Sequence, residues 1–302
     1  MTPPVPISSL IVENWFNGLY TAAMLVTLWV IITGTRYTGS RMRWQIALVL
    51  ASYICSTMHS SLNWLYYSQA VDDNEFPTGP GLVYSLTHLK VWIEATGDTF
   101  FCLNIFMTDC LFIWRCWVVW NRRWHIVVLP ILATISGAIL AGLMISDQVF
   151  AEQSSEAFTI AKKSADFVRH STIYFSLSVA TSLTTTFLIT LRILLVQRMG
   201  KKAGTGSHRT FNPIMEILIE SAALYSATLL IFVVLDVKKN TNLYYAQNIH
   251  AQMAGLAPLL IILRVAAGLS RPQEDWSGNL SGSLKFAPSN STLSASKQDV
   301  ET

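Results

Sequence analysis

Seven blocks of mostly apolar residues divide this chain, and their length constrains its fold more than any other feature of the sequence. A helix needs about 20 consecutive, predominantly apolar residues to cross the hydrocarbon core of a bilayer. The blocks predict an all-α fold, an integral membrane bundle of seven transmembrane helices with receptor-like topology within residues 1–270. The predicted spans are approximately Leu10–Thr33, Trp44–Tyr67, Val91–Val119, Ile126–Ile145, Thr172–Val196, Ile217–Asp236 and Ile249–Leu269.

These blocks do not have the pattern of buried helices in a soluble protein. Core helices tend to keep one polar face, whereas Ile126–Ile145 and Ala222–Leu235 have none. Only 13% of the 302 residues are charged, and a soluble domain usually has about 25% charged residues. The lipid bilayer is therefore the first partner that we expect.

The block Thr172–Val196 differs from the others because it contains many Ser and Thr residues. We expect it to be the weakest span by hydropathy. Ser and Thr can bond to carbonyls of the preceding turn, so a helix of this composition still inserts into a membrane. Its hydroxyl-bearing face should meet other helices.

Basic residues predict the orientation, because Lys and Arg accumulate in short cytoplasmic loops. One alternating set of loops, with its helix ends and the C-terminal segment, holds most of the 21 basic residues. The other set holds Lys90, Lys162, Lys163, Arg169, Lys238 and Lys239. We therefore expect the N-terminus outside, the C-terminus in the cytosol, and a location in the plasma membrane.

Two further segments are predicted to be cytoplasmic. Gln197–Pro213 is basic and contains glycine, so it should attract anionic lipid or an acidic signalling partner. Residues 271–302 are rich in Ser, Gly and Asn, which is typical of a disordered tail. Two sequons in this tail, at Asn279 and Asn290, stay unglycosylated if the tail is cytosolic. We expect no nucleic-acid partner.

Polar residues near the outer ends of the spans form one candidate site. Charged residues within membrane spans are costly and usually face a cavity or one another. Acidic groups together with histidines would suit a cationic or hydrogen-bonding ligand. The alternative is that each residue is hydrated near the interface and holds helices together. The predicted ligand-binding residues of this outer cavity are Glu13, Asn17, His59, Asn63, Glu94, Asp98, His250 and Gln252.

A second polar layer is predicted near the cytoplasmic ends of the spans. Glu216 and Glu220 are one helical turn apart, and like charges at that spacing repel unless an arginine lies between them. We expect ion pairs linking the third, sixth and seventh spans. They would act either as a conformational lock or as a static structural network. The residues of this inner layer are Asp109, Arg115, Glu216, Glu220 and Arg264.

Several specific chemistries can be tested against the sequence. The block Ile249–Leu269 has no lysine to form a retinal Schiff base, which excludes a rhodopsin-like pigment. His59 and His250 are the histidines clearly within spans, and with Ser56 and Asp98 they resemble the site of a seven-helix zinc hydrolase. Such enzymes use a spaced pair of histidines in the last helix, which this chain lacks. We expect no enzyme, no catalytic residue, no bound metal and no cofactor.

Cysteines and short motifs separate this chain from rhodopsin-like receptors. Its four cysteines, Cys55, Cys102, Cys110 and Cys116, fall in the second and third blocks, so we expect no extracellular disulfide. The third block lacks the acid–Arg–Tyr triplet at its end. The seventh has Gly255-Leu-Ala-Pro258-Leu-Leu where such receptors have Asn-Pro-x-x-Tyr.

Three longer stretches resemble a group of basidiomycete fungal seven-helix membrane proteins. They are TDCLFIWRCWVVWNRRW (Thr108–Trp124), ESAALYSATLLIFVV (Glu220–Val234) and IHAQMAGLAPLLIILRVAAGLSRP (Ile249–Pro272). The resemblance covers all seven spans and excludes the tail. It implies the fold, a multi-pass location and a fungal source, and it carries over no catalytic or binding residue.

The predicted function is that of a receptor-like sensor of an extracellular small molecule. Outer residues would bind the ligand, and the inner layer would gate the cytoplasmic face, although fold alone gives function only by analogy. A transporter or channel is the alternative, and it would need both polar layers to join along Asp98, Asn104 and Asp109. An intramembrane metal-dependent hydrolase and a purely structural membrane protein are the remaining alternatives.

Overall fold

The computed structural model describes residues 6–33, 40–72, 91–202, 212–238, 240 and 242–266. These residues lie in the compact unit Met1–Ser270, and the predicted tail, Arg271–Thr302, lies outside the described residues. Every regular element in the described part of the chain is a helix. The helices are α1 (Ile7–Thr33), α2 (Ser40–Asp72), α4 (Val91–Val119), α5 (Trp124–Gln153), α6 (Ala157–Lys202), α7 (Asn212–Val237) and α8 (Leu243–Ala266).

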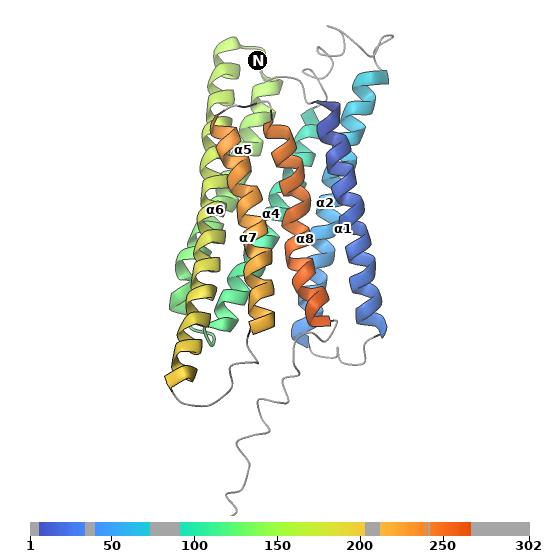
Figure 1. Ribbon diagram of the computed structural model, residues 1–302. Coiled ribbons are helices and arrows are strands. Elements are labelled where there is room, and N and C mark those ends of the chain that lie inside the picture. Colours follow the sequence, from blue (N-terminus) through green and yellow to red (C-terminus); the bar gives the residue numbers. More distant parts are fainter. Residues whose placement is uncertain are drawn as a thin grey trace, which may run out of the picture. The chain divides into compact units, whose positions relative to one another are not determined.

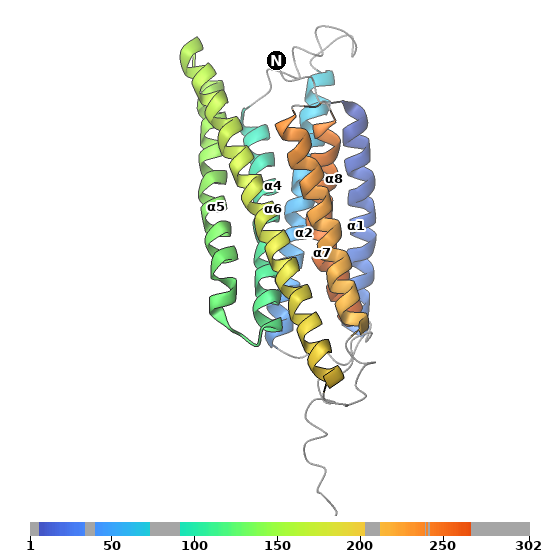
Figure 2. The ribbon, with the colours of Figure 1, turned by 60° about the vertical axis from the view of Figure 1, so that its left-hand side comes forward.

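Successive helices run in opposite directions and form an up-and-down bundle (Figure 1). α4 lies inside and packs against α2, α5, α6 and α8, while α8 also packs against α1, α2 and α7. Side chains of α1, α2 and α8 can therefore meet on one side of the bundle, and those of α4, α5 and α6 on the other (Figure 2). We call the end where α1 begins the N-terminal end of the bundle, and the opposite end the C-terminal end.

Six of the described helices are long and apolar enough to cross a membrane: α1, α4, α5, α6, α7 and α8. Large apolar side chains also point away from the bundle, as with Leu129 (69% exposed) and Phe187 (65% exposed). Outward-facing apolar surface of this kind is stable against lipid and unstable in water. The chain is therefore an integral, multi-pass membrane protein.

α2 is long enough to cross a membrane, but it is not apolar enough to be counted with these six described helices. Its hydropathy is lowered by a polar stripe at helical spacing, with Ser52, Ser56, Ser60 and Asn63. The expectation that the hydroxyl-rich span in α6 would be the weakest is therefore wrong, because α6 meets the requirement and α2 does not. The crossing by α2 stays a prediction.

α6 is longer than the predicted span. It has 46 residues and begins at Ala157, well before Thr172. At about 1.5 Å per residue such a helix is roughly 70 Å long, and the hydrocarbon core is about 30 Å thick. Its first turns stay attached to α5, because Asp147 pairs with Lys163 at 2.7 Å and with His170 at 2.8 Å. The hydropathy pattern did not identify the first turns of α6, before Thr172, because the part of a helix that extends out of the bilayer needs no apolar surface.

Gly255 of α8 determines how closely α1 can pack against α8. A Cβ atom placed on Gly255 would lie 2.6 Å from ring carbons of Tyr20, which is closer than real Cβ contacts come. Tyr20 is fully buried and packs with Met24 and Leu259. The missing side chain at Gly255 therefore makes room for the Tyr20 ring.

Candidate functional site

Three helices bring polar side chains together in the N-terminal half of the bundle, in a group that we call the Glu13 cluster. Glu13 and Gln252 are fully buried, and His59 is only 2% exposed. The cluster therefore belongs to the interior of the protein. Its members are Glu13 and Asn17 of α1, Ser56, His59 and Asn63 of α2, and Gln252 of α8.

Glu13 and Gln252 tie the cluster together. Asn63 Nδ2 donates to Glu13 Oε2 at 3.0 Å, and Gln252 Nε2 lies 3.5 Å from Glu13 Oε1. Ser56 and Asn17 donate to Gln252 Oε1 at 2.6 and 3.1 Å. A buried polar group that loses its partner costs about 1–3 kcal/mol. These bonds therefore fix α1, α2 and α8 relative to one another.

The hydrogen bonds of His59 assign its tautomer. Nδ1 lies 3.0 Å from the carbonyl oxygen of Gly97 on α4, and Nε2 lies 3.1 Å from Asn63 Nδ2. A carbonyl only accepts and an amide nitrogen only donates, so the proton belongs on Nδ1. Nε2 is also 3.7 Å from Glu13 Oε1. With its lone pair on Nε2, His59 contacts Glu13 without forming an ion pair.

The structure brings together some of the predicted outer residues and separates others. Glu13, Asn17, His59, Asn63 and Gln252 meet in the Glu13 cluster, where they contact one another. They form a closed network, and their role in binding a ligand stays a prediction.

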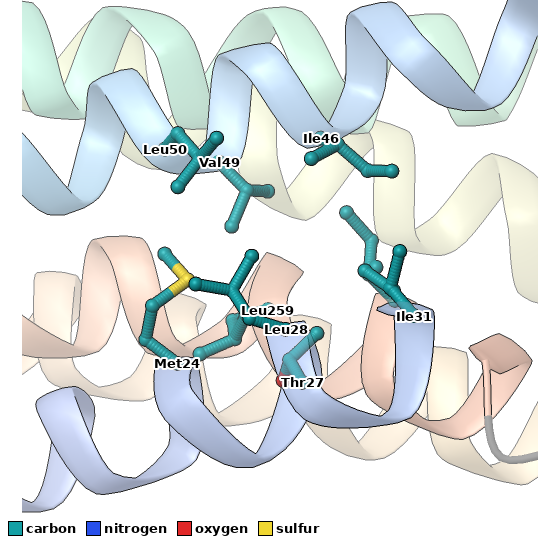
Figure 3. Close-up of a pocket in the computed structure, with 9 residues that line it drawn as sticks. Met24, Thr27, Leu28, Ile31, Ile46, Val49, Leu50 and Leu259 are labelled. Carbon is teal, nitrogen blue, oxygen red and sulfur yellow. The ribbon is translucent and has the colours of Figure 1, made fainter. Parts of the chain in front are cut away.

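A hollow lies between α1, α2 and α8, in the C-terminal half of the bundle (Figure 3). The empty space there, including the part that is open to the surroundings, is ≈ 200 Å³. The hydroxyl of Thr27 donates its hydrogen to the carbonyl of Ala23 at 2.7 Å, so it could only accept a hydrogen bond from a ligand. None of the predicted outer residues lines this hollow. Its lining residues are Met24, Thr27, Leu28, Ile31, Ile46, Val49, Leu50, Leu259 and Ile262.

Glu94 and Asp98 make their contacts outside the Glu13 cluster. They are one turn apart on α4 and face α5, where Gln148 contacts Asp98 and Glu152 contacts Glu94. Glu94 and Glu152 are exposed, Asp98 is partly buried, and Gln148 is 8% exposed. The residues predicted for one outer cavity thus belong to separate groups.

His250 belongs to neither group. Its Nδ1 lies 3.1 Å from the hydroxyl of Thr228, and its Nε2 is buried with no hydrogen-bond partner. The Phe101 ring packs against both His250 and His59, with centroid distances of 6.2 and 5.3 Å. The two imidazoles thus have different polar partners. In the described residues, no group of three or more His, Cys, Asp or Glu side chains is placed to hold a metal ion.

Polar side chains of α4 bond to the backbone of α8 between the Glu13 cluster and the C-terminal end of the bundle. Asn104 Nδ2 donates to the carbonyl of Ala251 at 2.7 Å, and the Thr108 hydroxyl donates to that of Ala254 at 2.8 Å. Ser52 of α2 bonds to Asn104 Oδ1. All of these side chains are buried. Polar contacts therefore continue from the Glu13 cluster towards the middle of the bundle.

Asp109, a member of the predicted inner layer, has hydroxyl partners. Ser178 of α6 donates to its Oδ2 at 2.8 Å, and Tyr225 of α7 donates to its Oδ1 at 3.2 Å. Asp109 is 3% exposed. Its bonds join α4, α6 and α7. The expected ion pair at Asp109 is thus replaced by hydrogen bonds, because short hydroxyl side chains of α6 and α7 reach the carboxylate.

The remaining inner residues also depart from a single ion-pair layer. Arg264 of α8 pairs with Glu220 of α7 at 3.8 Å, and both side chains are largely exposed. Arg115 is 7% exposed, and its Nη1 has no hydrogen-bond partner. The side chain of Glu216 lies outside the described residues. One predicted link, between the last two helices, is therefore present in the structure.

Several residues of these groups are absent from the predicted outer cavity. Ser56 enters the sequence prediction only as part of a zinc-hydrolase site, and the polar stripe of α2 was the signal that could have assigned it to the Glu13 cluster. Gln148 and Glu152 are one turn apart on α5, as Glu94 and Asp98 are on α4. The sequence gives no sign that these two pairs face each other. Comparison of the chain with models of protein families, with curated proteins and with solved structures gives no match.

Proposed function

We propose that this protein is a receptor-like sensor of an extracellular small molecule. One observation carries the proposal: α8 makes a polar contact with a neighbouring helix in each half of the bundle, a buried one in the N-terminal half and an exposed one near the C-terminal end. Gln252 belongs to the Glu13 cluster, and Arg264 pairs with Glu220 near the C-terminal end. A rearrangement of the cluster would therefore move the helix that also carries the Arg264 contact.

The packing of α8 supports transmission of such a movement. Most of its side chains are buried, and it contacts α1, α2, α4 and α7. Packed interiors resist continuous deformation and switch between discrete arrangements. A proline at position 258 lies between Gln252 and Arg264 and removes one backbone bond from the helix. α8 is thus the element that we assign as the conformational switch.

The orientation belongs to the same proposal. With the N-terminus outside and the C-terminus in the cytosol, the Glu13 cluster would lie in the half facing the cell exterior. The Arg264–Glu220 pair would face a cytoplasmic signalling partner. A plasma-membrane location and the fungal source implied by the sequence resemblance complete the proposal.

The coupling between the two ends can be tested without a ligand. Spin labels at Arg123 and Leu263, in a variant with its native cysteines replaced, would report the distance between the α4–α5 turn and the end of α8. Gln252→Ala should change that distance distribution. Asn248→Ala is the matched control, since Asn248 is also buried on α8 but bonds to the Ser9 carbonyl. Identical distributions for the parent protein and a folded Gln252→Ala variant would refute the proposed coupling.

Transport is a second candidate, favoured by the continuity of polar contacts. Ser56 lies 2.6 Å from Gln252 Oε1 and 3.4 Å from the carbonyl of Ala251, which also accepts from Asn104. Proton flux into liposomes, lost in Asp109→Asn and kept in Asp166→Asn, would favour transport. Asp166 is a suitable control because it pairs with Arg169 on the exposed part of α6. No flux through the parent protein would count against transport.

A further inference from the structure

A second polar group, distinct from the Glu13 cluster, lies where the N-terminal end of α4 meets the C-terminal end of α5. Glu94 and Asp98 form an i, i+4 pair on α4, and Gln148 and Glu152 form an i, i+4 pair on α5. Residues at this spacing lie on the same helix face. The two faces meet, with Glu94 against Glu152 and Asp98 against Gln148.

Three carboxyl groups, those of Glu94, Asp98 and Glu152, lie along this contact between α4 and α5. Between described residues, the ion pairs involve other acids, namely Asp147, Asp166 and Glu220. Carboxylates in direct contact repel each other unless a proton or a cation lies between them. Glu94 and Glu152 are hydrogen-bonded to each other, so a proton lies between them, and a cation is the other species that could occupy that place.

Gln148 provides an independent observation. Its side chain is 8% exposed, and its amide contacts Asp98. Its Oε1 is buried and has no hydrogen-bond partner. Buried polar atoms in proteins nearly always have a partner, and an orphan requires a physical explanation. A buried acceptor left open on a side chain that contacts Asp98 indicates that a hydrogen-bond donor belongs there.

We infer that Glu94, Asp98, Gln148 and Glu152 form a binding site for a small organic ammonium ion. The open groups of the site are carboxylate oxygens and an amide oxygen, and these are acceptors. A primary ammonium group has a positive charge and three N–H donors, which matches them. The exposed Glu94 and Glu152 form the entrance, and the partly buried Asp98 with Gln148 forms the inner end.

The arrangement suits an ammonium ion better than a metal ion. A metal such as Ca²⁺ needs several oxygen ligands at about 2.3–2.6 Å from one point. In the described part of the chain, no three His, Cys, Asp or Glu side chains are placed to hold one metal ion together. An ammonium group can use separate acceptors through separate N–H bonds. The inference rests on the proposed function and gives the chemical class of its ligand.

The test is thermal unfolding of the full-length protein in nanodiscs at constant ionic strength. The probes are ethylammonium, tetramethylammonium and calcium chloride, with sodium chloride as the reference. Ethylammonium should raise the unfolding midpoint in a saturable way. Tetramethylammonium has the same charge but no N–H group, so it should bind more weakly.

Variants assign the binding to these residues. Asp98→Asn removes a charged acceptor and should weaken ethylammonium binding by about 10- to 100-fold. Gln148→Leu should weaken ethylammonium binding least of the three variants. Glu152→Gln should weaken it by a factor between those of Gln148→Leu and Asp98→Asn. Glu156→Gln is the matched control, because Glu156 is an exposed acid at the same end that bonds to Thr159. It should leave the affinity unchanged.

The outcomes separate this inference from the proposed function. No saturable shift with ethylammonium, or a shift that Asp98→Asn leaves unaltered, overturns the site. A calcium shift without an ethylammonium shift overturns the ligand class. Ethylammonium binding that leaves the Arg123–Leu263 distance unchanged supports the site and contradicts a sensor coupled to it. The Gln252→Ala result decides the coupling independently of any ammonium probe.

Discussion

The hydroxyl of Thr108 lies 2.8 Å from the carbonyl oxygen of Ala254, and it donates its hydrogen there. In a regular helix this carbonyl would accept from the N–H four residues later, but that position is Pro258, which has no N–H. The hydroxyl is also 2.9 Å from the carbonyl of Asn104 in its own helix. A side chain of α4 thus takes the place of the missing backbone donor of α8.

Replacing Thr108 by valine should destabilise the protein, because it leaves the Ala254 carbonyl without a donor. Hydrogen bonds between membrane helices contribute about 0.6 kcal/mol on average and up to about 1.7 kcal/mol, so we expect a loss of about 1 kcal/mol. Thr108→Ser keeps the hydroxyl and should lose less. Reversible unfolding in mixed micelles measures both.

Thr108→Val should reduce the free energy of unfolding by less when α8 itself supplies a donor to the Ala254 carbonyl. Pro258→Ala restores the N–H that bonds to Ala254, so Thr108→Val in this background should have a smaller effect. A double-mutant cycle measures the difference as a coupling free energy. Equal costs in both backgrounds would show that the hydroxyl does not compensate for the proline.

Adding a methyl group at Gly255 should destabilise the contact between α1 and α8. Gly255→Ala places a Cβ against the Tyr20 ring, and overpacking of this kind costs about 1–3 kcal/mol. Gly142→Ala is the control, because a Cβ there has no atom within 4 Å. It should be neutral or stabilise by a few tenths to about 1 kcal/mol, since alanine favours helix over glycine. Thermal unfolding compares the two.

Asp147 should control the stability of the first turns of α6. Asp147→Asn weakens the contacts with Lys163 and His170, so backbone amides near residues 157–170 should exchange faster with solvent. Asp166→Asn breaks a pair with Arg169 that is exposed, and exposed pairs contribute little. Hydrogen–deuterium exchange should distinguish the two variants. Similar exchange for both would exclude a clamping role for Asp147.

Glycosylation tests the orientation. With a cytosolic C-terminus, Asn279 and Asn290 should have no glycan after expression in a eukaryotic cell. A sequon appended before Met1 should be modified in the same cells. A mass shift removed by a glycosidase is the measurement. A glycan at Asn279 in the chain without the added sequon would reverse the orientation.

The sequence predicts the spans well where burial in lipid sets their composition. The helix α4 has the same bounds as the block Val91–Val119. The first turns of α6 were missed because they need no apolar surface. For the polar residues, the sequence predicted that His59, Asn63, Glu94 and Asp98 lie near the same ends of their spans, and the four-residue spacing places His59 with Asn63 and Glu94 with Asp98 on one face of each helix. Which helix each pair faces depends on rotation about the helix axis, which a single sequence does not specify.

The length of α6 has a mechanical consequence. A continuous helix of 46 residues acts as a stiff rod that is clamped to α5 near one end by Asp147. A tilt of about one degree displaces a point about 30 Å along such a rod by roughly 0.5 Å. Because α6 also packs against α4 and α7, such a tilt would displace their contacts with α6 as well. The length of α6 therefore links its exposed first turns to the helices that surround its later turns.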